Sequence, residues 1–322
     1  MDVVKNISVI FISIFFESLP FLLLGSFLSA CIETYVSNET IAKIIPKNKI
    51  LGSIVGVFLG FFLPACDCAV IPVSKRLLKK EVPINVAISF MLASPIINPV
   101  VLLSTYNAFY RTSPEIFWYR MLFGIIISLL VGIVMGIIFG KKEVIINRLI
   151  DDEDECSHCN NHEENSSIKH CQCNHEHKKH SSFKHNILSI CKHTAIDTFE
   201  VVKYLMFGAL IASFVQVLLP RSVLTVFNNN EVLSIITLML FAYLISLCST
   251  SDSFVGKSLL KTFSKSSIIA YLLLGPMIDI KNTVVLLGNY KKNFVWTLIF
   301  LIFVVIFVFS LLVVKILWKK DF

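Results

Sequence analysis

Charged residues are scarce in this chain of 322 residues. They make up only 16% of the sequence, whereas hydrophobic residues make up 55% and the mean hydropathy is +0.76. Soluble globular proteins carry nearer a quarter charged residues, so the composition favours a membrane protein. Two enzyme signatures are also missing: a Gly-x-x-x-x-Gly-Lys-Ser/Thr phosphate-binding loop and a His-Glu-x-x-His zinc motif. We therefore expect a protein that is not an enzyme.

Long apolar runs recur along the chain, with lysine and arginine clusters between them. A helix needs about 20 apolar residues to cross ~30 Å of hydrocarbon. The sequence therefore predicts an all-α, polytopic integral membrane protein with about eight transmembrane helices. The predicted spans are residues 7–32, 50–73, 84–106, 117–140, 198–219, 231–250, 266–288 and 294–318. Leu28-Ser29-Ala30-Cys31 imitates a lipoprotein cleavage site, but Glu17 and Pro20 interrupt the preceding segment, so we expect it to remain as the first span.

If the chain crosses the membrane eight times, both termini lie on the same side. The loops on that side contain more lysine and arginine than the loops on the other side. The positive-inside rule places such loops in the cytoplasm. We therefore expect a multi-pass protein of the cell (cytoplasmic) membrane, with both termini and the central loop in the cytoplasm. The net charge of +7 follows from this topology. The lipid bilayer is the expected surrounding, and no nucleic-acid partner is expected.

Blocks of the first half recur in the second half at nearly constant spacing. The matching blocks are Phe16–Gly25 with Phe199–Gly208, Cys66–Lys79 with Cys248–Lys261, and Ser94–Asn98 with Gly275–Asp279. They pair Glu17 with Glu200 and Lys75 with Lys257. The matches predict two repeated four-helix halves, residues 1–140 and 193–322, joined by a loop at 141–192. Because four is even, we expect parallel halves; if one cysteine segment is re-entrant, the halves are inverted instead.

Broken helices are predicted where proline and polar residues interrupt the apolar runs. In Pro64-Ala65-Cys66-Asp67-Cys68-Ala69-Val70-Ile71-Pro72, the prolines remove amide donors and kink or unwind the backbone. In an extended segment Cys66 and Cys68 lie on one face, where two sulfurs suit a soft cation such as Cu(I), Zn(II) or a trivalent metalloid. The alternative is that both are small packing residues at a helix break.

Paired interruptions of this kind are typical of a transport site. The predicted substrate pathway is Cys66, Asp67, Cys68, Pro72, Pro95, Asn98, Cys248, Asp252, Pro276 and Asp279. The hydroxyl residues around Cys248 can instead serve close helix packing. Glu17 and Glu200 are candidates for proton or ion coupling. A structural ion pair is the alternative for Glu200.

Histidine is concentrated in the central loop, which holds seven of the eight histidines of the chain, and the eighth, His193, follows directly after it. The predicted metal ligands are Cys156, His158, Cys159, His162, His170, Cys171, Cys173, His175, His177 and His180. Their spacings suit Zn or Cu ions. The middle of the loop, residues 151–182, is poor in apolar residues, so we expect the loop to be disordered without metal. A solvated linker is the alternative, and no cofactor is required by the rest of the chain.

The segments Cys66–Val73, Arg76–Lys80 and Phe90–Pro99 resemble the UPF0718, or YraQ-type, family of predicted permeases. The resemblance covers essentially the whole chain except the loop. It implies eight spans, a transport role and a second small membrane protein as partner. Related permeases are described as organoarsenical or copper/zinc exporters, some with a His/Cys-rich loop. Cys66, Cys68, Pro72, Pro95 and Asn98 match the family motif, whereas Ala69 stands where the copper/zinc branch has glycine.

The leading hypothesis is a secondary permease that exports a soft metal or metalloid ion. The loop would capture the ion and pass it to Cys66 and Cys68, and the two halves would rock around a site at the membrane midplane. One alternative is a permease subunit for an organic solute such as an amino acid, with a metal-sensing loop. A third hypothesis, from another class, is a membrane thiol–disulfide enzyme that uses Cys66 and Cys68 with Cys31 as partner.

Overall fold

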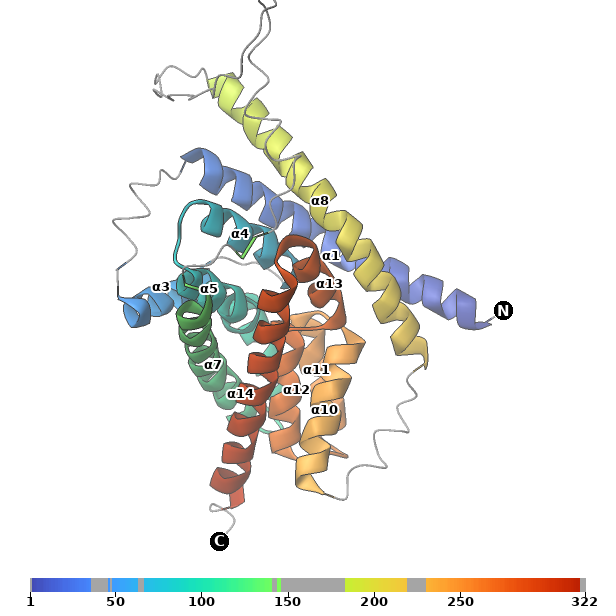
Figure 1. Ribbon diagram of the computed structural model, residues 1–322. Helices are drawn as coiled ribbons and strands as arrows, with labels where there is room; N and C mark the ends of the chain where they lie inside the picture. Colours follow the sequence, from blue (N-terminus) through green and yellow to red (C-terminus); the bar gives the residue numbers. More distant parts are fainter. Residues whose placement is uncertain are drawn as a thin grey trace, which may run out of the picture.

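The structure is a computed structural model that describes residues 2–35, 46, 48–62, 67–140, 144–145, 183–218 and 230–318. Within these residues the chain consists of helices and short connections, with one isolated antiparallel bridge between Ile145 and Tyr290. The prediction of an all-α, polytopic membrane protein is confirmed (Figure 1). The helices are α1 (Asp2–Tyr35), α3 (Lys49–Phe62), α4 (Asp67–Lys79), α5 (Ile84–Ile97), α6 (Pro99–Phe109), α7 (Glu115–Phe139), α8 (Phe183–Leu218), α10 (Glu231–Ile245), α11 (Ser249–Leu259), α12 (Lys265–Met277), α13 (Ile280–Asn289) and α14 (Lys292–Trp318).

Six stretches of the described chain are long and apolar enough to cross a membrane. They are Val4–Cys31, Ile84–Phe109, Glu115–Phe139, Thr194–Leu218, Lys265–Asn289 and Lys292–Val314. The predicted spans at 50–73 and 231–250 are not among them. Helices α3 and α10 have 14 and 15 residues. At 1.5 Å per residue each is about 21–23 Å long, short of the ~30 Å of hydrocarbon, so the eight predicted spans are corrected to six.

Helices α3 and α4 form a hairpin that enters and leaves the bundle at the same end. Gly52 of α3 lies against Asn85 of α5, and Gly60 lies against Ser94. Helix α3 therefore runs parallel to α5. Helix α4 runs antiparallel to α5, because only the tight turn at 80–83 separates them. The hairpin is thus re-entrant and adds no crossing to the topology.

Helices α10 and α11 form a second hairpin of the same kind. The Ser267 hydroxyl of α12 donates to the Ser234 hydroxyl of α10 at 3.0 Å, and the rings of Phe241 and Tyr271 lie 6.1 Å apart further along. Helix α10 therefore runs parallel to α12. Helix α11 leads through a short turn straight into α12 and runs back against it, with Asp252 beside Tyr271.

The same order of elements occurs in α1–α7 and in α8–α14: a long helix, a hairpin, a broken helix and a final span (Figure 1). The final spans α7 and α14 run antiparallel, because Phe123 lies 5.4 Å from Phe309 while Phe139 lies 5.2 Å from Phe294, between ring centroids. The expected parallel arrangement of the halves is therefore wrong. Each series contributes three spans, and an odd number reverses the direction of the next series.

Three spans also separate the N-terminus from the central loop, so these two parts lie on opposite faces of the membrane. This count differs from the expectation from the sequence, which placed both parts in the cytoplasm. We call the end of the bundle where α7 ends and α8 begins the loop face. The opposite end, where α1 begins and α14 ends, is the terminal face.

Helices α1 and α8 cross the bundle obliquely and pack against each other along one side (Figure 1). Ile14 of α1 clusters with Ala209 and Ala212 of α8. Helix α8 begins at Phe183, well before the predicted start at residue 198. Residues 183–192, assigned to the loop from the sequence, therefore belong to this helix.

Candidate functional site

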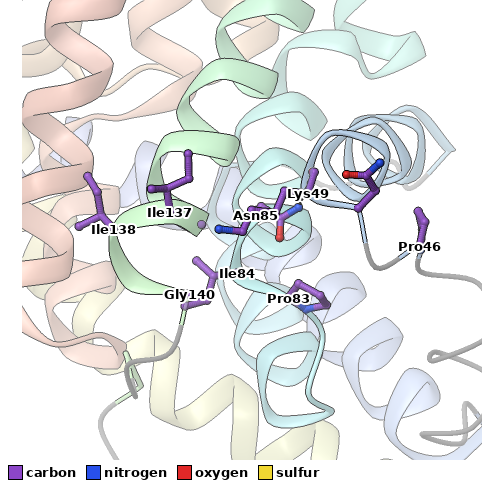
Figure 2. A pocket seen from close by; sticks show the side chains of 10 residues that line it. Pro46, Lys49, Pro83, Ile84, Asn85, Ile137, Ile138 and Gly140 are labelled. Atoms are coloured by element: carbon purple, nitrogen blue, oxygen red, sulfur yellow. Dashed lines mark hydrogen bonds between the residues drawn. The ribbon is translucent and has the colours of Figure 1, made fainter.

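A cavity lies near the loop face. It has a volume of about 450 Å³ and is bordered by the starts of α3 and α5 and the end of α7 (Figure 2). Its lining residues are Pro46, Asn48, Lys49, Pro83, Ile84, Asn85, Gly136, Ile137, Ile138 and Gly140. None of the predicted pathway residues is among them. The predicted chemistry therefore lies elsewhere, in the middle of the bundle.

Four short helices begin in the middle of the bundle, where the two hairpins meet the two broken helices. Helix α4 lies beside α13, and both run toward the loop face. Helix α11 lies beside α6, and both run toward the terminal face. The N-terminal end of a helix carries a partial positive charge and unpaired amide donors. Four such ends at one depth form a polar centre inside an apolar bundle.

The breaks in the long helices are capped by polar side chains at equivalent places. The Asn98 side chain accepts the Val100 amide at 3.0 Å and caps α6, and the Asp279 carboxylate accepts the Asn282 amide at 2.6 Å and caps α13. Pro95 and Pro276 lie in the last turns of α5 and α12, each three residues before its cap. Proline removes one helical hydrogen bond, so each helix stops within a turn and restarts at the cap. Pro72 instead lies inside α4.

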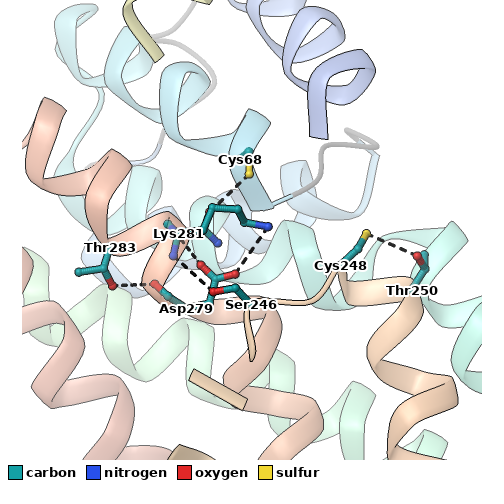
Figure 3. Close-up of polar contacts among 8 residues, drawn as sticks. Cys68, Ser246, Cys248, Thr250, Asp279, Lys281 and Thr283 are labelled. Atoms are coloured by element: carbon teal, nitrogen blue, oxygen red, sulfur yellow. Dashed lines mark hydrogen bonds and ion pairs between the residues drawn. The ribbon is translucent and has the colours of Figure 1, made fainter. Parts of the chain in front are cut away.

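Cys68 lies in the first turn of α4 and faces the start of α13 (Figure 3). Its thiol Sγ is 3.6 Å from the amide oxygen of Asn282. The Lys281 ammonium is 3.7 Å from Oδ2 of Asp279, and the Lys281 amide donates to the Ser246 hydroxyl at 3.4 Å. One thiol, one carboxylate and one ammonium group therefore meet where α4, α13 and the tip of the α10–α11 hairpin converge.

The hairpin tip holds a strained backbone. Ser246 has a φ of 51° and a ψ of 49°, the left-handed conformation. A residue with a Cβ adopts this conformation at a cost of about 1–2 kcal/mol, and such residues concentrate at functional sites. The strain directs the Ser246 hydroxyl toward the start of α13.

Three buried carboxyl groups lie in the polar centre, from Asp67, Asp252 and Asp279. Their residues are 6%, 2% and 0% exposed. Each carboxyl has one oxygen without a hydrogen-bond partner among the described residues, Oδ1 of Asp67 and Oδ2 of Asp252 and Asp279. A buried polar atom without a partner is costly. Oδ2 of Asp279 still has the Lys281 ammonium 3.7 Å away, so the free oxygens of Asp67 and Asp252 are the two that can accept a proton, a cation or a polar solute.

Two buried cations, Arg120 and Lys281, accompany these carboxyl groups. Lys281 acts electrostatically on Asp67, and Arg120 acts on Asp252. If all five groups are ionised, three negative charges face two positive charges in this part of the structure. One negative charge is then uncompensated, which favours the binding of one additional positive charge.

Arg120 is the largest fully buried side chain in the described residues. Its guanidinium donates at 2.7 Å to the Thr105 hydroxyl of α6, at 2.8 Å to the Ser253 hydroxyl of α11, and at 3.3 Å to the Ser249 carbonyl. The side chain therefore links α7 to both half-helices that run to the terminal face. Near Cys248, the Ser253 hydroxyl and the Ser249 carbonyl belong to this network.

Asp252 is held by α12. The Tyr271 hydroxyl donates to its Oδ1 at 3.0 Å. Gly275 leaves room for the other oxygen, because a Cβ at Gly275 would come within 2.6 Å of Oδ2. This glycine thus allows the free carboxylate oxygen to lie directly against the backbone of α12.

The two matched glutamates lie in different surroundings. Glu200 accepts two hydrogen bonds from the Lys75 ammonium, at 2.9 and 3.1 Å, so the structural ion pair is the interpretation that the contacts support. Glu17 is exposed on α1 in the middle of a span and has no ion-pair partner among the described residues. Cys248 is partly exposed, with its thiol 3.5 Å from the Thr250 hydroxyl.

Several predicted ligands lie outside the described residues. These are Cys66 and the ten loop residues Cys156, His158, Cys159, His162, His170, Cys171, Cys173, His175, His177 and His180. Among the residues that the structure does describe, no three His, Cys, Asp or Glu side chains converge closely enough to hold a metal ion. The metal-binding hypothesis therefore depends on Cys66 and the loop and stays a prediction.

Sequence reasoning missed Arg120, Tyr271 and Lys281. All three lie inside apolar segments, and a charge inside a span is itself a signal of function. The signal was therefore present in the sequence for both cations, and only the Tyr271 contact required the structure.

The chain was compared with known protein families and relatives. A family described as "Predicted permease" matches residues 3–315. A Bacillus subtilis protein named "UPF0718 protein YcgR" is 38% identical over 304 residues, covering 94% of this chain and 95% of that protein. A Streptococcus mutans protein named as a candidate subunit of a two-component membrane permease complex is 34% identical over 304 residues, covering 94% and 93%. No solved structure matches.

Proposed function

Because this chain belongs to the UPF0718 family of predicted membrane permeases, we propose that it is a secondary transporter that exports a soft metal or metalloid ion. The observation that supports this most directly is the buried Cys68 thiol, which lies 3.6 Å from the Asn282 side chain, close in sequence to the Lys281–Asp279 pair, where a hairpin meets a broken helix. Sulfur selects soft cations, and the buried carboxyl oxygens of Asp67 and Asp252 that have no hydrogen-bond partner among the described residues can bind one. Cys66, two residues before Cys68, would supply the second sulfur.

The proposed direction of transport rests on topology. Lysine and arginine are more numerous in the connections at the loop face than in those at the terminal face. The positive-inside rule then places the loop face in the cytoplasm and both termini on the opposite side. This assignment keeps the His/Cys-rich loop in the reducing compartment, where its thiols stay available for Zn or Cu ions. In the proposed route the loop captures the ion and delivers it to Cys66 and Cys68.

Inverted halves give this route a mechanism. The antiparallel α7 and α14 and the equivalent caps at Asn98 and Asp279 support two inverted halves. Transporters of this design expose a midplane site to one face at a time by moving one part against the other. Proton coupling through Glu17 or Glu200 is part of the proposal.

Metal uptake into proteoliposomes that contain the purified chain tests the proposal. We expect accumulation of Cu(I), Zn(II) or As(III), and a loss of more than about tenfold in rate for Cys68→Ala. Cys191→Ala is the matched control, because Cys191 is exposed on α8 outside the polar centre. If wild-type protein accumulates none of the three ions, or if both cysteine variants behave alike, the metal proposal is wrong.

One observation favours a second candidate, a permease for an organic anion or amino acid. The N-terminal ends of four half-helices, together with Arg120 and Lys281, suit a carboxylate group. In that case the loop would regulate transport and would not carry the substrate. Deletion of residues 150–180 distinguishes the two: solute uptake persists without the loop, whereas metal delivery does not. The thiol–disulfide enzyme keeps its own test, the trapping of a mixed disulfide in Cys68→Ser.

A second membrane subunit is the proposed partner. The support is the name of the Streptococcus mutans relative, which assigns that protein to a two-component complex. Affinity purification of the chain from its native membrane in detergent, with identification of any co-purifying membrane protein by mass spectrometry, tests this proposal. A monodisperse chain that transports fully without any second protein would exclude an obligatory partner.

A further inference from the structure

Helices α1 and α8 both pack against the half-helices that lead to the loop face. An added Cβ at Gly25 of α1 would come within 2.5 Å of the Ala69 Cβ in α4. An added Cβ at Gly208 of α8 would come within 3.0 Å of the Lys281 Cα in α13. The sequence blocks pair Gly25 with Gly208. Matched glycines therefore make matched close approaches, one on each member of the α4–α13 pair.

The α6–α11 pair, which leads to the terminal face, has no comparable cover. Neither α1 nor α8 packs extensively on α6 or α11 within the described residues. Val100, Leu103 and Phe254 on this pair are 58%, 61% and 57% exposed. Every residue from Asp67 to Lys75 of α4, in contrast, is buried. The α4–α13 pair and the α6–α11 pair thus offer similar surfaces, and in this structure α1 and α8 pack on the α4–α13 pair.

An ion pair fixes the occupied arrangement. Lys75 of α4 binds Glu200 of α8, with the side chains 8% and 20% exposed. The sequence matches of Lys75 and Glu200 are Lys257 of α11 and Glu17 of α1. Both of these are exposed, and neither forms an ion pair with another described residue. A charged Glu17 in the middle of a span is costly unless it gains a partner.

We propose that the chain has a second state in which α1 and α8 pack against α6 and α11, and Glu17 binds Lys257 in place of the Lys75–Glu200 pair. This inference rests on the transport function proposed above, because alternating access requires two such states. In the second state, packing on the α6–α11 pair takes the place of equivalent packing on the α4–α13 pair. The two states therefore differ little in free energy, which a switch requires.

The geometry makes the exchange short. Glu17 already acts electrostatically on Cys248, at the start of α11. Lys257 follows on the same helix, about 13 Å further along its axis at 1.5 Å per residue. A rocking movement of α1 and α8 of this size toward the terminal face brings the two charges together. The same movement uncovers Cys68, which is 2% exposed in the present state.

Differential alkylation with N-ethylmaleimide tests the inference. Peptide mapping by mass spectrometry reads Cys68 and Cys248 separately, so the other cysteines can stay in place. Lys75→Gln removes the ion pair of the present state, and we expect faster labelling of Cys68 by about tenfold and slower labelling of Cys248. Lys257→Gln removes the proposed pair and should shift both rates in the opposite direction. The double exchange Lys75→Glu with Glu200→Lys should restore the wild-type rates.

Lys265→Gln is the matched control, because it removes an exposed ion pair with Glu115, at 2.6 Å, that both states keep. Its two labelling rates should equal those of the wild type. Rates that rise together in Lys75→Gln and Lys257→Gln would indicate loosening of the fold and overturn the inference. So would an unchanged Cys68 rate in Lys75→Gln. The assay needs no substrate, so the inference and the metal proposal can fail independently.

Discussion

Arg120 offers the strongest single test of how the polar centre is held together. Replacing it with methionine keeps most of the side-chain volume and removes the guanidinium. The substitution removes the three hydrogen bonds that join α7 to α6 and α11. Their acceptors are the Thr105 hydroxyl, the Ser253 hydroxyl and the Ser249 carbonyl. The electrostatic compensation of Asp252 disappears as well.

The magnitude follows from the burial of Arg120, which is 0% exposed. Removing one member of a buried charge pair leaves the other uncompensated and costs about 3–5 kcal/mol. At roughly 2–4 °C per kcal/mol for a chain of this order of size, the apparent Tm in detergent should fall by about 10 °C. Combining Arg120→Met with Asp252→Asn removes both charges, so the double variant should recover a large part of the loss.

Thermal unfolding followed by size-exclusion chromatography measures these values. Arg111→Met is the matched control, because Arg111 is exposed in the connection between α6 and α7, and its Tm should stay within about 1–2 °C of the wild type. A Tm of Arg120→Met equal to that of the control would refute the account of the network. Additive effects in the double variant would refute the electrostatic link to Asp252.

Two further predictions concern the surroundings of the carboxyl groups. Gly275→Ala places a methyl group within 2.6 Å of Asp252 Oδ2. We therefore expect a loss of about 1–3 kcal/mol in stability and slower transport. Ser258→Ala, at an exposed position of α11, is the control and should keep wild-type transport. Lys281→Met removes the cation 3.7 Å from Asp279. Equilibrium dialysis should then show metal binding about tenfold tighter, and proteoliposomes should show slower release of the metal. Weaker metal binding would contradict the assignment of Lys281 as an internal counter-ion.

The sequence was sufficient to predict a helical membrane protein, and its error was in the number of crossings. Residues 50–73 are apolar over a length that fits a span, and residues 231–250 are too. A re-entrant hairpin and a span have the same composition, because both are surrounded by apolar groups. Only tertiary contacts distinguish them, such as Gly52 against Asn85, which makes α3 parallel to α5. The parallel arrangement expected for the two halves failed for the same reason.

The candidate site was predictable where a side chain stood alone in an apolar run. Asp67, Asp252 and Asp279 were found in this way, and the structure buries all three. Their partners were harder to predict, because Arg120 lies in another helix and Tyr271 in a segment without an unusual pattern. Pairing depends on which helices lie side by side, and hydropathy carries no information on this.

The arrangement of α1 and α8 also determines when the loop can deliver an ion. Cys68 lies in the first turn of α4, one of the two half-helices that lead to the loop face. In the present state α1 and α8 cover this α4–α13 pair. Cys248, beside the uncovered pair, is partly exposed. In the proposed transport route, an ion held by the loop therefore reaches Cys68 only after the Lys75–Glu200 pair opens. Glu200 then acts as a gate on the loop side, and Glu17 would do the same on the terminal side, which gives the two matched glutamates one function at opposite faces.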